Sequence, residues 1–282
     1  MSAQRRLDNV DPETVAGFGE EWAAFDQSEL SAEDLREQFN RYFQIFPFDE
    51  LPPDAEGFDL GCGSGRWAGE VAKRVGLLRC IDPSSKALDV ARRRLAACPN
   101  VKFHLAPVDR IPLEDSSQDF GYSLGVLHHV PDTAGGLRDC VRKLKPGAPF
   151  LLYLYYALDG RPAWFRALWN VADAARRRIS MLPFRQKKRV SELIAATVYW
   201  PLARAAGLFE NLGADVFHWP LSSYRHGSFY RMRTDALDRF GTRLERRFTR
   251  EQVERMMRDA GLNDVRFSER EPFWVAFGRR AR

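Results

Sequence analysis

The stretch Gly57-Phe58-Asp59-Leu60-Gly61-Cys62-Gly63-Ser64-Gly65-Arg66-Trp67 decides the fold of this 282-residue chain. Residues 58–60 are typical of a short strand, and 66–74 contains no helix breaker, so we predict a strand, a tight turn and a helix. Glycines at such a turn permit positive φ and let a ligand approach the backbone. The N–H groups at the start of the helix favour an acceptor-rich ligand. A nucleotide-like molecule is therefore the natural candidate.

An acidic residue follows the next apolar run. Asp82 lies 19 residues after Gly63, at the end of the run 77–81. In a Rossmann-like fold, a carboxylate at the tip of the second strand accepts hydrogen bonds from two vicinal ribose hydroxyls. Glycine turns also join strands to helices where nothing binds, so the glycines alone are weak evidence. Together with Asp82 they predict a nucleoside site.

Four segments in sequence order resemble the class I S-adenosylmethionine-dependent methyltransferases. The opening motif 59–65 is followed by segments similar to the third, fourth and fifth strands of that family, at 105–120, 121–132 and 144–156. The resemblance spans residues 55–156, with a weaker echo at 246–279. It implies a Rossmann-like α/β fold whose seven-stranded sheet is mostly parallel and has an antiparallel last strand.

The resemblance also implies a cofactor site. Three glycines would approach the methionine and ribose parts of S-adenosylmethionine, and a backbone segment after the fourth strand would lie along the methionyl portion. Asp59 would orient the turn or the amino group, Asp82 the ribose hydroxyls and Asp109 the adenine amine, with Val108 against the ring. The implied residues are Asp59, Gly61, Gly63, Gly65, Asp82, Val108, Asp109, Leu124 and Gly125.

Two histidines, His128 and His129, follow the predicted fourth strand. A neutral imidazole at this position can take a proton from a hydroxyl or amine acceptor, and His129 is the stronger candidate for the base. The alternative is that these histidines only order the loop. Aromatic and histidine side chains further along the chain are candidate substrate contacts or apolar walls of the site: Tyr155, Tyr156, His218, Tyr224 and His226.

Composition indicates a soluble globular protein, with 45% hydrophobic and 29% charged residues. The four cysteines form no CxxC pair, and the polar N-terminus lacks an apolar signal region, so we expect reduced thiols and a cytoplasmic location. No apolar run reaches the ~20 residues of a spanning helix. No His/Cys/carboxylate cluster has metal-ligand spacing, so we expect no metal.

The chain divides by pattern into four parts. We expect an N-terminal helical cover at 1–53, in which Trp22, Tyr42 and Phe43 either pack on the domain or face the cofactor. The cofactor-binding core follows at 54–156, a helical insertion acting as substrate lid at 157–233, and the closing helix and strands at 234–282. Capping boxes at Ser31 and Thr249 mark two helix starts.

A basic run, 176–189, holds seven Lys or Arg residues and no acidic residue. It is either a solvated helix face or a contact for an acidic substrate, an RNA backbone or an anionic membrane surface. An RNA-binding protein should carry an extra module or a more basic chain, and so we do not expect nucleic-acid binding.

The function that these features favour is methyl transfer from S-adenosylmethionine to a small molecule. Aromatic residues of the insertion suit an acceptor with a ring or an apolar chain. The absence of an Asn/Asp-Pro-Pro-aromatic motif after the fourth strand, where the chain has Ser123-Leu-Gly-Val126, argues against adenine, cytosine and glutamine amide acceptors. The alternatives are an RNA or protein methyltransferase that docks through 176–189, and a cofactor-binding module without catalysis.

Overall fold

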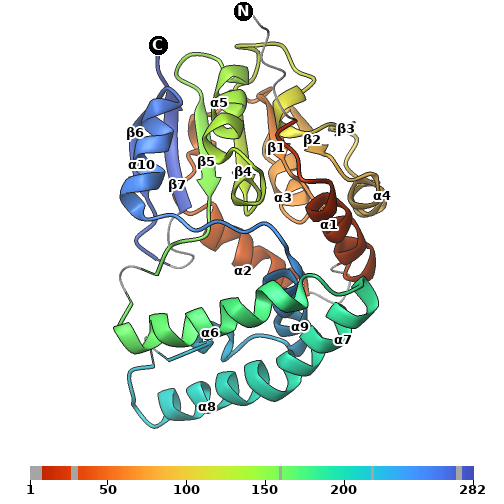
Figure 1. Ribbon diagram of the computed structural model, residues 1–282. Coiled ribbons are helices and arrows are strands. Elements are labelled where there is room, and N and C mark those ends of the chain that lie inside the picture. The colour runs from red at the N-terminus through yellow and green to blue at the C-terminus, as the bar shows by residue number, and fades with distance from the viewer. Residues whose placement is uncertain (1–7, 27–30, 159–160, 217–218, 271–274) are drawn as a thin grey trace, which may run out of the picture. The chain divides into compact units, whose positions relative to one another are not determined.

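The protein is described here by a computed structural model that covers residues 8–26, 31–158, 161–216, 219–270 and 275–282 (Figure 1). Contacts divide the chain into two compact units. Unit 1 contains the described residues of 8–26 and 31–157 together with those of 244–282, and unit 2 contains those of 158–243. Each unit is a separate body with its own core.

Unit 1 is built on a seven-stranded sheet with the order β3-β2-β1-β4-β5-β7-β6. The first five strands run parallel, and β7 is antiparallel to both of its neighbours. This confirms the mostly parallel sheet with an antiparallel last strand that the sequence predicts. The strands are β1 Glu56–Leu60, β2 Leu77–Asp82, β3 Val101–Leu105, β4 Phe120–Leu124, β5 Pro149–Tyr153, β6 Leu262–Phe267 and β7 Val275–Arg280.

Helices cover both faces of this sheet, because its central strands are apolar on both sides. Phe58 and Phe150 point into one core with α5 and α10, while Phe120 and Leu78 belong to the other, with α2, α3 and α4. All four side chains are fully buried. The helices of unit 1 are α1 Pro12–Ala24, α2 Ala32–Tyr42, α3 Ala68–Ala72, α4 Ser85–Arg94, α5 Thr133–Lys143 and α10 Arg250–Asp259.

Local signals set several helix starts. Ser31 caps α2 by accepting from the N–H of Asp34 at 3.0 Å, and Thr249 forms a capping box with Gln252. Other boundaries differ from expectation. The helix α3 is shorter than 66–74, and β4 ends at Leu124 because Gly125 adopts a left-handed φ of 78°. The expected strand start at Phe273 lies outside the described residues.

Unit 2 is all-helical, as expected for the insertion. Its elements are α6 Ala163–Ile179, α7 Phe184–Ile194, a π-helical turn Ala195–Tyr199, α8 Trp200–Asn211, a 3₁₀ turn Ser222–Tyr224 and α9 Phe229–Gly241. The helix α9 runs across position 233 without a break. Its core comprises Ala195, Tyr199, Ala203, Met232, Ala236 and Phe240.

The basic run is not uniformly solvated. Arg176 donates to the carbonyl of Thr242 at 2.9 Å, and Lys187 donates to the carbonyl of Gly241 at 3.1 Å. Both side chains are buried and satisfy acceptors at the C-terminal end of α9. These two cations are therefore part of the framework of unit 2.

Candidate functional site

The glycine loop after β1 takes a conformation that side chains rarely allow. Gly61, Gly63 and Gly65 have φ of 73°, 53° and 73°. A Cβ on Gly61 would lie 2.4 Å from the side chain of Val126. The N–H groups of Gly61 and Cys62 donate to the carbonyl of Ile81, at 2.7 and 3.2 Å, and hold the loop on the end of β2. The loop therefore lies against the backbone at the end of β2. Its glycines carry no side chains that would block the approach of a ligand.

Asp82, at the end of β2, is fixed by this loop. Its Oδ2 accepts from the N–H of Gly63 at 2.9 Å, and its Oδ1 accepts from the N–H of Ser84 at 2.8 Å. Burial raises the pKa of Asp82 to about 6, although both hydrogen bonds lower it. Each carboxylate oxygen retains a second lone pair. The geometry therefore suits two vicinal hydroxyl donors.

Two further carboxyl groups present buried oxygen atoms. Among the described residues, Oδ1 of Asp109 has no hydrogen-bond partner, and Oδ2 of Asp59 is buried near the hydroxyl of Tyr122. Burial raises the pKa of Asp59 to about 8, while Tyr122 lowers it and the charge of Asp82 raises it further. Native proteins rarely leave buried acceptors without a partner. Both atoms fit a ligand that carries N–H donors, as S-adenosylmethionine does with its amino group and adenine amine.

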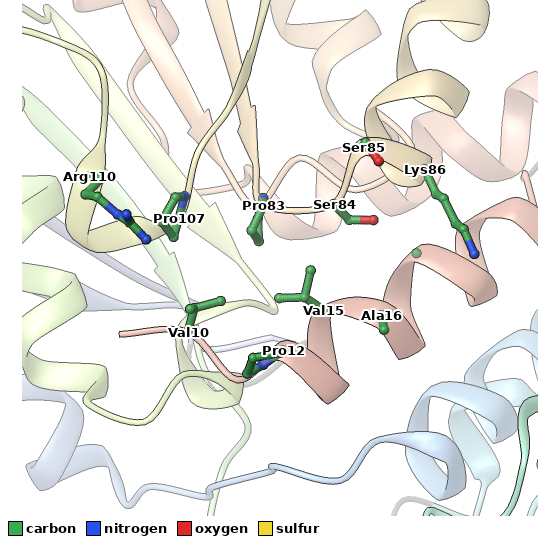
Figure 2. Close-up of a pocket in the computed structure, with 11 residues that line it drawn as sticks. Val10, Pro12, Val15, Ala16, Pro83, Ser84, Ser85, Lys86, Pro107 and Arg110 are labelled. Atoms are coloured by element: carbon green, nitrogen blue, oxygen red, sulfur yellow. The ribbon is translucent and has the colours of Figure 1, made fainter. Parts of the chain in front are cut away.

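A pocket of about 440 Å³ lies between α1 and the loops that follow β2 and β3 (Figure 2). Its walls include the residues that directly follow Asp82 and those that flank Asp109. They are Val10, Pro12, Val15, Ala16, Gly19, Pro83, Ser84, Ser85, Lys86, Pro107 and Arg110. The volume lies within the usual range for a small-ligand site.

The segment that begins α1 is tied to this region by Asn9. Its backbone N–H donates to Oδ2 of Asp109 at 3.1 Å, and its side chain exchanges two hydrogen bonds with the backbone of Asp132, at 2.8 and 2.7 Å. Further along α1, the indole of Trp22 lies above Gly63, 2.9 Å from where a Cβ would stand. The sequence predicts a helical cover over 1–53 without locating this helix, although Asp11 before Pro12 is a cap signal that marks its start.

The two histidines lie together at the carboxyl end of β4. Their ring centres are 4.0 Å apart, and the ring centres of His128 and Tyr155 are 3.9 Å apart with the ring planes tilted by 33°. Phe18 of α1 contacts His129 at 4.9 Å. His128 is fully buried, and neither of its ring nitrogens has a partner among the described residues. Burial, then the charges of His129 and Arg247, lower its pKa well below the usual value.

The tautomer of His129 follows from its hydrogen bond. Its Nδ1 lies 2.7 Å from the carbonyl oxygen of Leu244, which can only accept, so Nδ1 carries the proton. In the neutral ring Nε2 then holds the lone pair. His129 is therefore oriented as a proton acceptor through Nε2.

A chain segment at 244–248, absent from the sequence-based site, borders both histidines. Its backbone N–H at Arg246 donates to the carbonyl of His128 at 3.0 Å, and Phe248 pairs with Tyr156. Glu245, with its side chain 2% exposed, forms an ion pair with Arg247 at 2.8 Å. The guanidinium of Arg247 lies 5.1 Å from the ring centre of Tyr155. No local motif marks this segment.

The predicted residues thus fall into groups. The predicted cofactor residues all belong to unit 1. Asp59 lies in β1, the three glycines lie in the loop after it, and Asp82 ends β2. Val108 and Asp109 lie in a 3₁₀ turn after β3, and Leu124 and Gly125 lie at the end of β4. Tyr155 joins the histidines. In unit 2, Tyr224 packs against Tyr199, and His226 pairs with Glu210 at 2.9 Å. His218 lies outside the described residues. The roles of these residues stay predictions.

Comparisons with known proteins identify the domain. Residues 58–152 match the family model described as a methyltransferase domain. The chain is 36% identical over 115 residues to an uncharacterised 37.1 kDa protein of transposon Tn4556 from Streptomyces fradiae, covering 40% of this chain and 31% of that protein. It is 30% identical over 157 residues to a ubiquinone biosynthesis O-methyltransferase from Methylocella silvestris, covering 49% and 61%.

Among solved structures, a proposed methyltransferase from Bacillus halodurans C-125 has a TM-score of 0.51 at 15% identity, over 82% of this chain and 72% of that one. At this identity the likeness concerns the fold. The sheet order and the glycine loop are those of the Rossmann-like methyltransferase fold.

Residues 58–152 are therefore a methyltransferase domain with the Rossmann-like fold of the class I S-adenosylmethionine-dependent methyltransferases. The aligned region covers only 31% and 61% of the two curated relatives named above.

Proposed function

We propose that this chain transfers a methyl group from S-adenosylmethionine to a hydroxyl or amine of a small molecule. The observation that carries the proposal is the orientation of His129, whose Nδ1–H is held by the carbonyl of Leu244 so that Nε2 can accept a proton. The surrounding cluster is aromatic, with His128 buried and Tyr155 and Phe18 partly buried. Such a site suits a small acceptor better than a polymer.

The cofactor would be held by the three carboxylates. Asp82 would accept from the ribose hydroxyls, Asp109 from the adenine amine through Oδ1, and Asp59 from the amino group. The buried oxygens of Asp59 and Asp109 support these roles. Val108 would lie against the adenine ring, and the backbone at Leu124 and Gly125 along the methionyl part.

When bound, the cofactor supplies an electrophilic methyl group on a sulfonium. The contribution of this chain is to position the acceptor and to receive its proton. His129 Nε2 would take the proton that a hydroxyl or amine loses, while the closely packed rings of His128 and Tyr155 would exclude water.

Names of relatives support a small acceptor. Besides the ubiquinone biosynthesis O-methyltransferase, the chain is 32% identical over 111 residues to phosphoethanolamine N-methyltransferase 2 of Caenorhabditis elegans, covering 38% of this chain and 25% of that protein. We propose that the helical insertion, 157–233, selects the acceptor, and that its aromatic side chains favour a ring or an apolar chain.

The cofactor assignment is tested by calorimetry on Asp82→Ala. Removal of this acceptor should weaken binding of S-adenosylmethionine by about 1–3 kcal/mol, because ribose hydroxyls lose their partner. Asp89→Ala, an exposed position on α4, is the matched control and should bind as the wild type does. Unchanged affinity in Asp82→Ala would remove the ribose assignment. Failure of the wild type to bind would contradict the proposed activity.

A cofactor-binding module without catalysis is the second candidate. It would bind S-adenosylmethionine with the same dependence on Asp82 and release no S-adenosylhomocysteine with any acceptor. Docking of RNA through 176–189 is not favoured, because Arg176 and Lys187 are occupied with backbone carbonyls of unit 2.

A further inference from the structure

Exposed apolar side chains are concentrated in unit 2. Thirteen large apolar side chains of the described residues are more than about a third exposed, and twelve of them belong to unit 2. Unit 1 contributes only Leu105 to this set. Soluble domains seldom gather so many without a binding partner. This difference between the units indicates that the exposed apolar side chains of unit 2 contact an apolar environment.

On α6 the exposed apolar residues follow helical spacing. Trp164, Leu168 and Val171 are 54%, 50% and 70% exposed and lie at positions i, i+4 and i+7. Such positions share one face of a helix. The face is therefore an exposed apolar stripe and not a random scatter.

A second row extends along α7, the π-helical turn and α8, which follow one another without a break (Figure 1). Its members are exposed and lie four residues apart on each side of the π-helical turn: Arg185, Arg189, Leu193 and Thr197, then Trp200, Arg204, Leu208 and Leu212. Leu193, Leu208 and Leu212 are 61%, 60% and 74% exposed. We call these eight residues the α7–α8 row. It alternates blocks of cations with apolar side chains and contains no acid.

The surrounding sequence is mostly positively charged. Residues 176–212 contain eight Lys or Arg and two Glu. One of the acids, Glu210, is paired with Arg225 at 2.7 Å and with His226. The guanidinium of Arg204 lies 4.0 Å over the ring of Trp200, where aliphatic stem and indole are both exposed. This pairing of Arg and Trp suits a boundary between water and hydrocarbon.

We propose that the α7–α8 row docks unit 2 on the surface of an anionic lipid bilayer. Leucines and tryptophan would enter the boundary between headgroups and acyl chains, and Arg185, Arg189 and Arg204 would meet lipid phosphates. None of the described helices has the length and apolar character to cross a bilayer. A nucleic-acid surface would leave the leucines in water, and a second copy of this row would oppose cation to cation. A lipid surface provides acyl chains for the apolar side chains and phosphates for the cations.

Sedimentation of the full chain with vesicles tests the proposal. The wild type should bind vesicles of phosphatidylcholine with phosphatidylglycerol, and binding should fall with rising salt. Arg185→Glu with Arg189→Glu should weaken binding at least about tenfold, since each cation near the surface contributes ~1 kcal/mol. The double variant Leu193→Ser with Leu208→Ser should lose at least about as much vesicle binding, because it inserts less apolar area into the bilayer.

Matched controls come from unit 1. Leu105→Ser removes an equally exposed leucine. Arg93→Glu with Lys102→Glu reverses two exposed cations. Both control variants should bind anionic vesicles as the wild type does. Circular dichroism checks that each variant is folded. The proposal is overturned if the wild type ignores anionic vesicles, if it binds pure phosphatidylcholine equally, or if the unit 1 controls lose as much as the row variants. Absence of vesicle binding with a dimer that the leucine variant abolishes would assign the row to a second copy.

Discussion

Asp59 is a buried carboxyl whose ionisation opposes folding. Burial raises its pKa to about 8, whereas the ordinary value is 3.8. The folded state therefore keeps a proton that the unfolded state releases between these values. By linkage, the stability that this proton provides is complete below pH 3.8 and is lost as pH rises through 8.

The substitution Asp59→Asn should remove this dependence on pH. Between pH 5 and pH 8 the free energy of unfolding of the wild type should fall on the order of 3 kcal/mol more than that of the variant. Asp82, with its pKa raised to about 6, causes a smaller decrease in the free energy of unfolding, and this decrease is the same in both proteins. Urea denaturation at both pH values measures the difference. Parallel pH curves would show that Asp59 titrates normally.

His129→Ala should lower kcat by roughly 10²–10⁴, because the residue is oriented to accept the proton of the acceptor. Binding of S-adenosylmethionine should be nearly intact, since the nucleoside contacts are elsewhere in unit 1. Steady-state kinetics and calorimetry on the same preparation separate the two effects. His104→Ala, a partly buried histidine on β3, is the control and should retain activity. Turnover near the wild-type level from pH 6 to 9 would show that positioning alone suffices.

At the scale of elements, α1 is held to the rest of unit 1 by Asn9. The substitution Asn9→Ala removes two hydrogen bonds to the backbone of Asp132, each contributing about 1 kcal/mol. Hydrogen exchange should therefore speed up at the amides of α1 while the central strands stay protected. Ser31→Ala is the control, because it removes a cap of α2 and should loosen α2 alone. Unchanged exchange in α1 would mean that other contacts hold the helix.

For the whole molecule, we expect cofactor binding to be independent of unit 2. All candidate nucleoside contacts belong to unit 1, and the exposed basic residues at 185–189 belong to unit 2. The triple variant Arg185→Glu, Lys188→Glu and Arg189→Glu should therefore bind S-adenosylmethionine within about twofold of the wild type. Lys187 is spared because it donates to the carbonyl of Gly241. A large loss of affinity in a folded variant would contradict this division between the units.

Much of unit 1 could be predicted because its signals are local. Alternating apolar runs locate the strands, and the spacing of Gly61, Gly63 and Asp82 identifies the loop and the strand tip. Boundaries were less accurate where a turn depends on packing, as at the short helix α3. The α1 helix went unrecognised because its cap signal is brief and its partners, Asp109 and Asp132, lie at least 100 residues away.

The sequence by itself determined the fold class and the glycine loop, because φ preferences, periodicity and motif spacing act over a few residues, and the family resemblance pointed to the three carboxylates. Only the tertiary structure decided which nitrogen of His129 accepts a proton, since that depends on the carbonyl of Leu244, 115 residues later. It also placed 244–248 beside the histidines and separated buried from exposed cations in 176–189. Such outcomes depend on which distant groups share one desolvated space, and no local pattern encodes that.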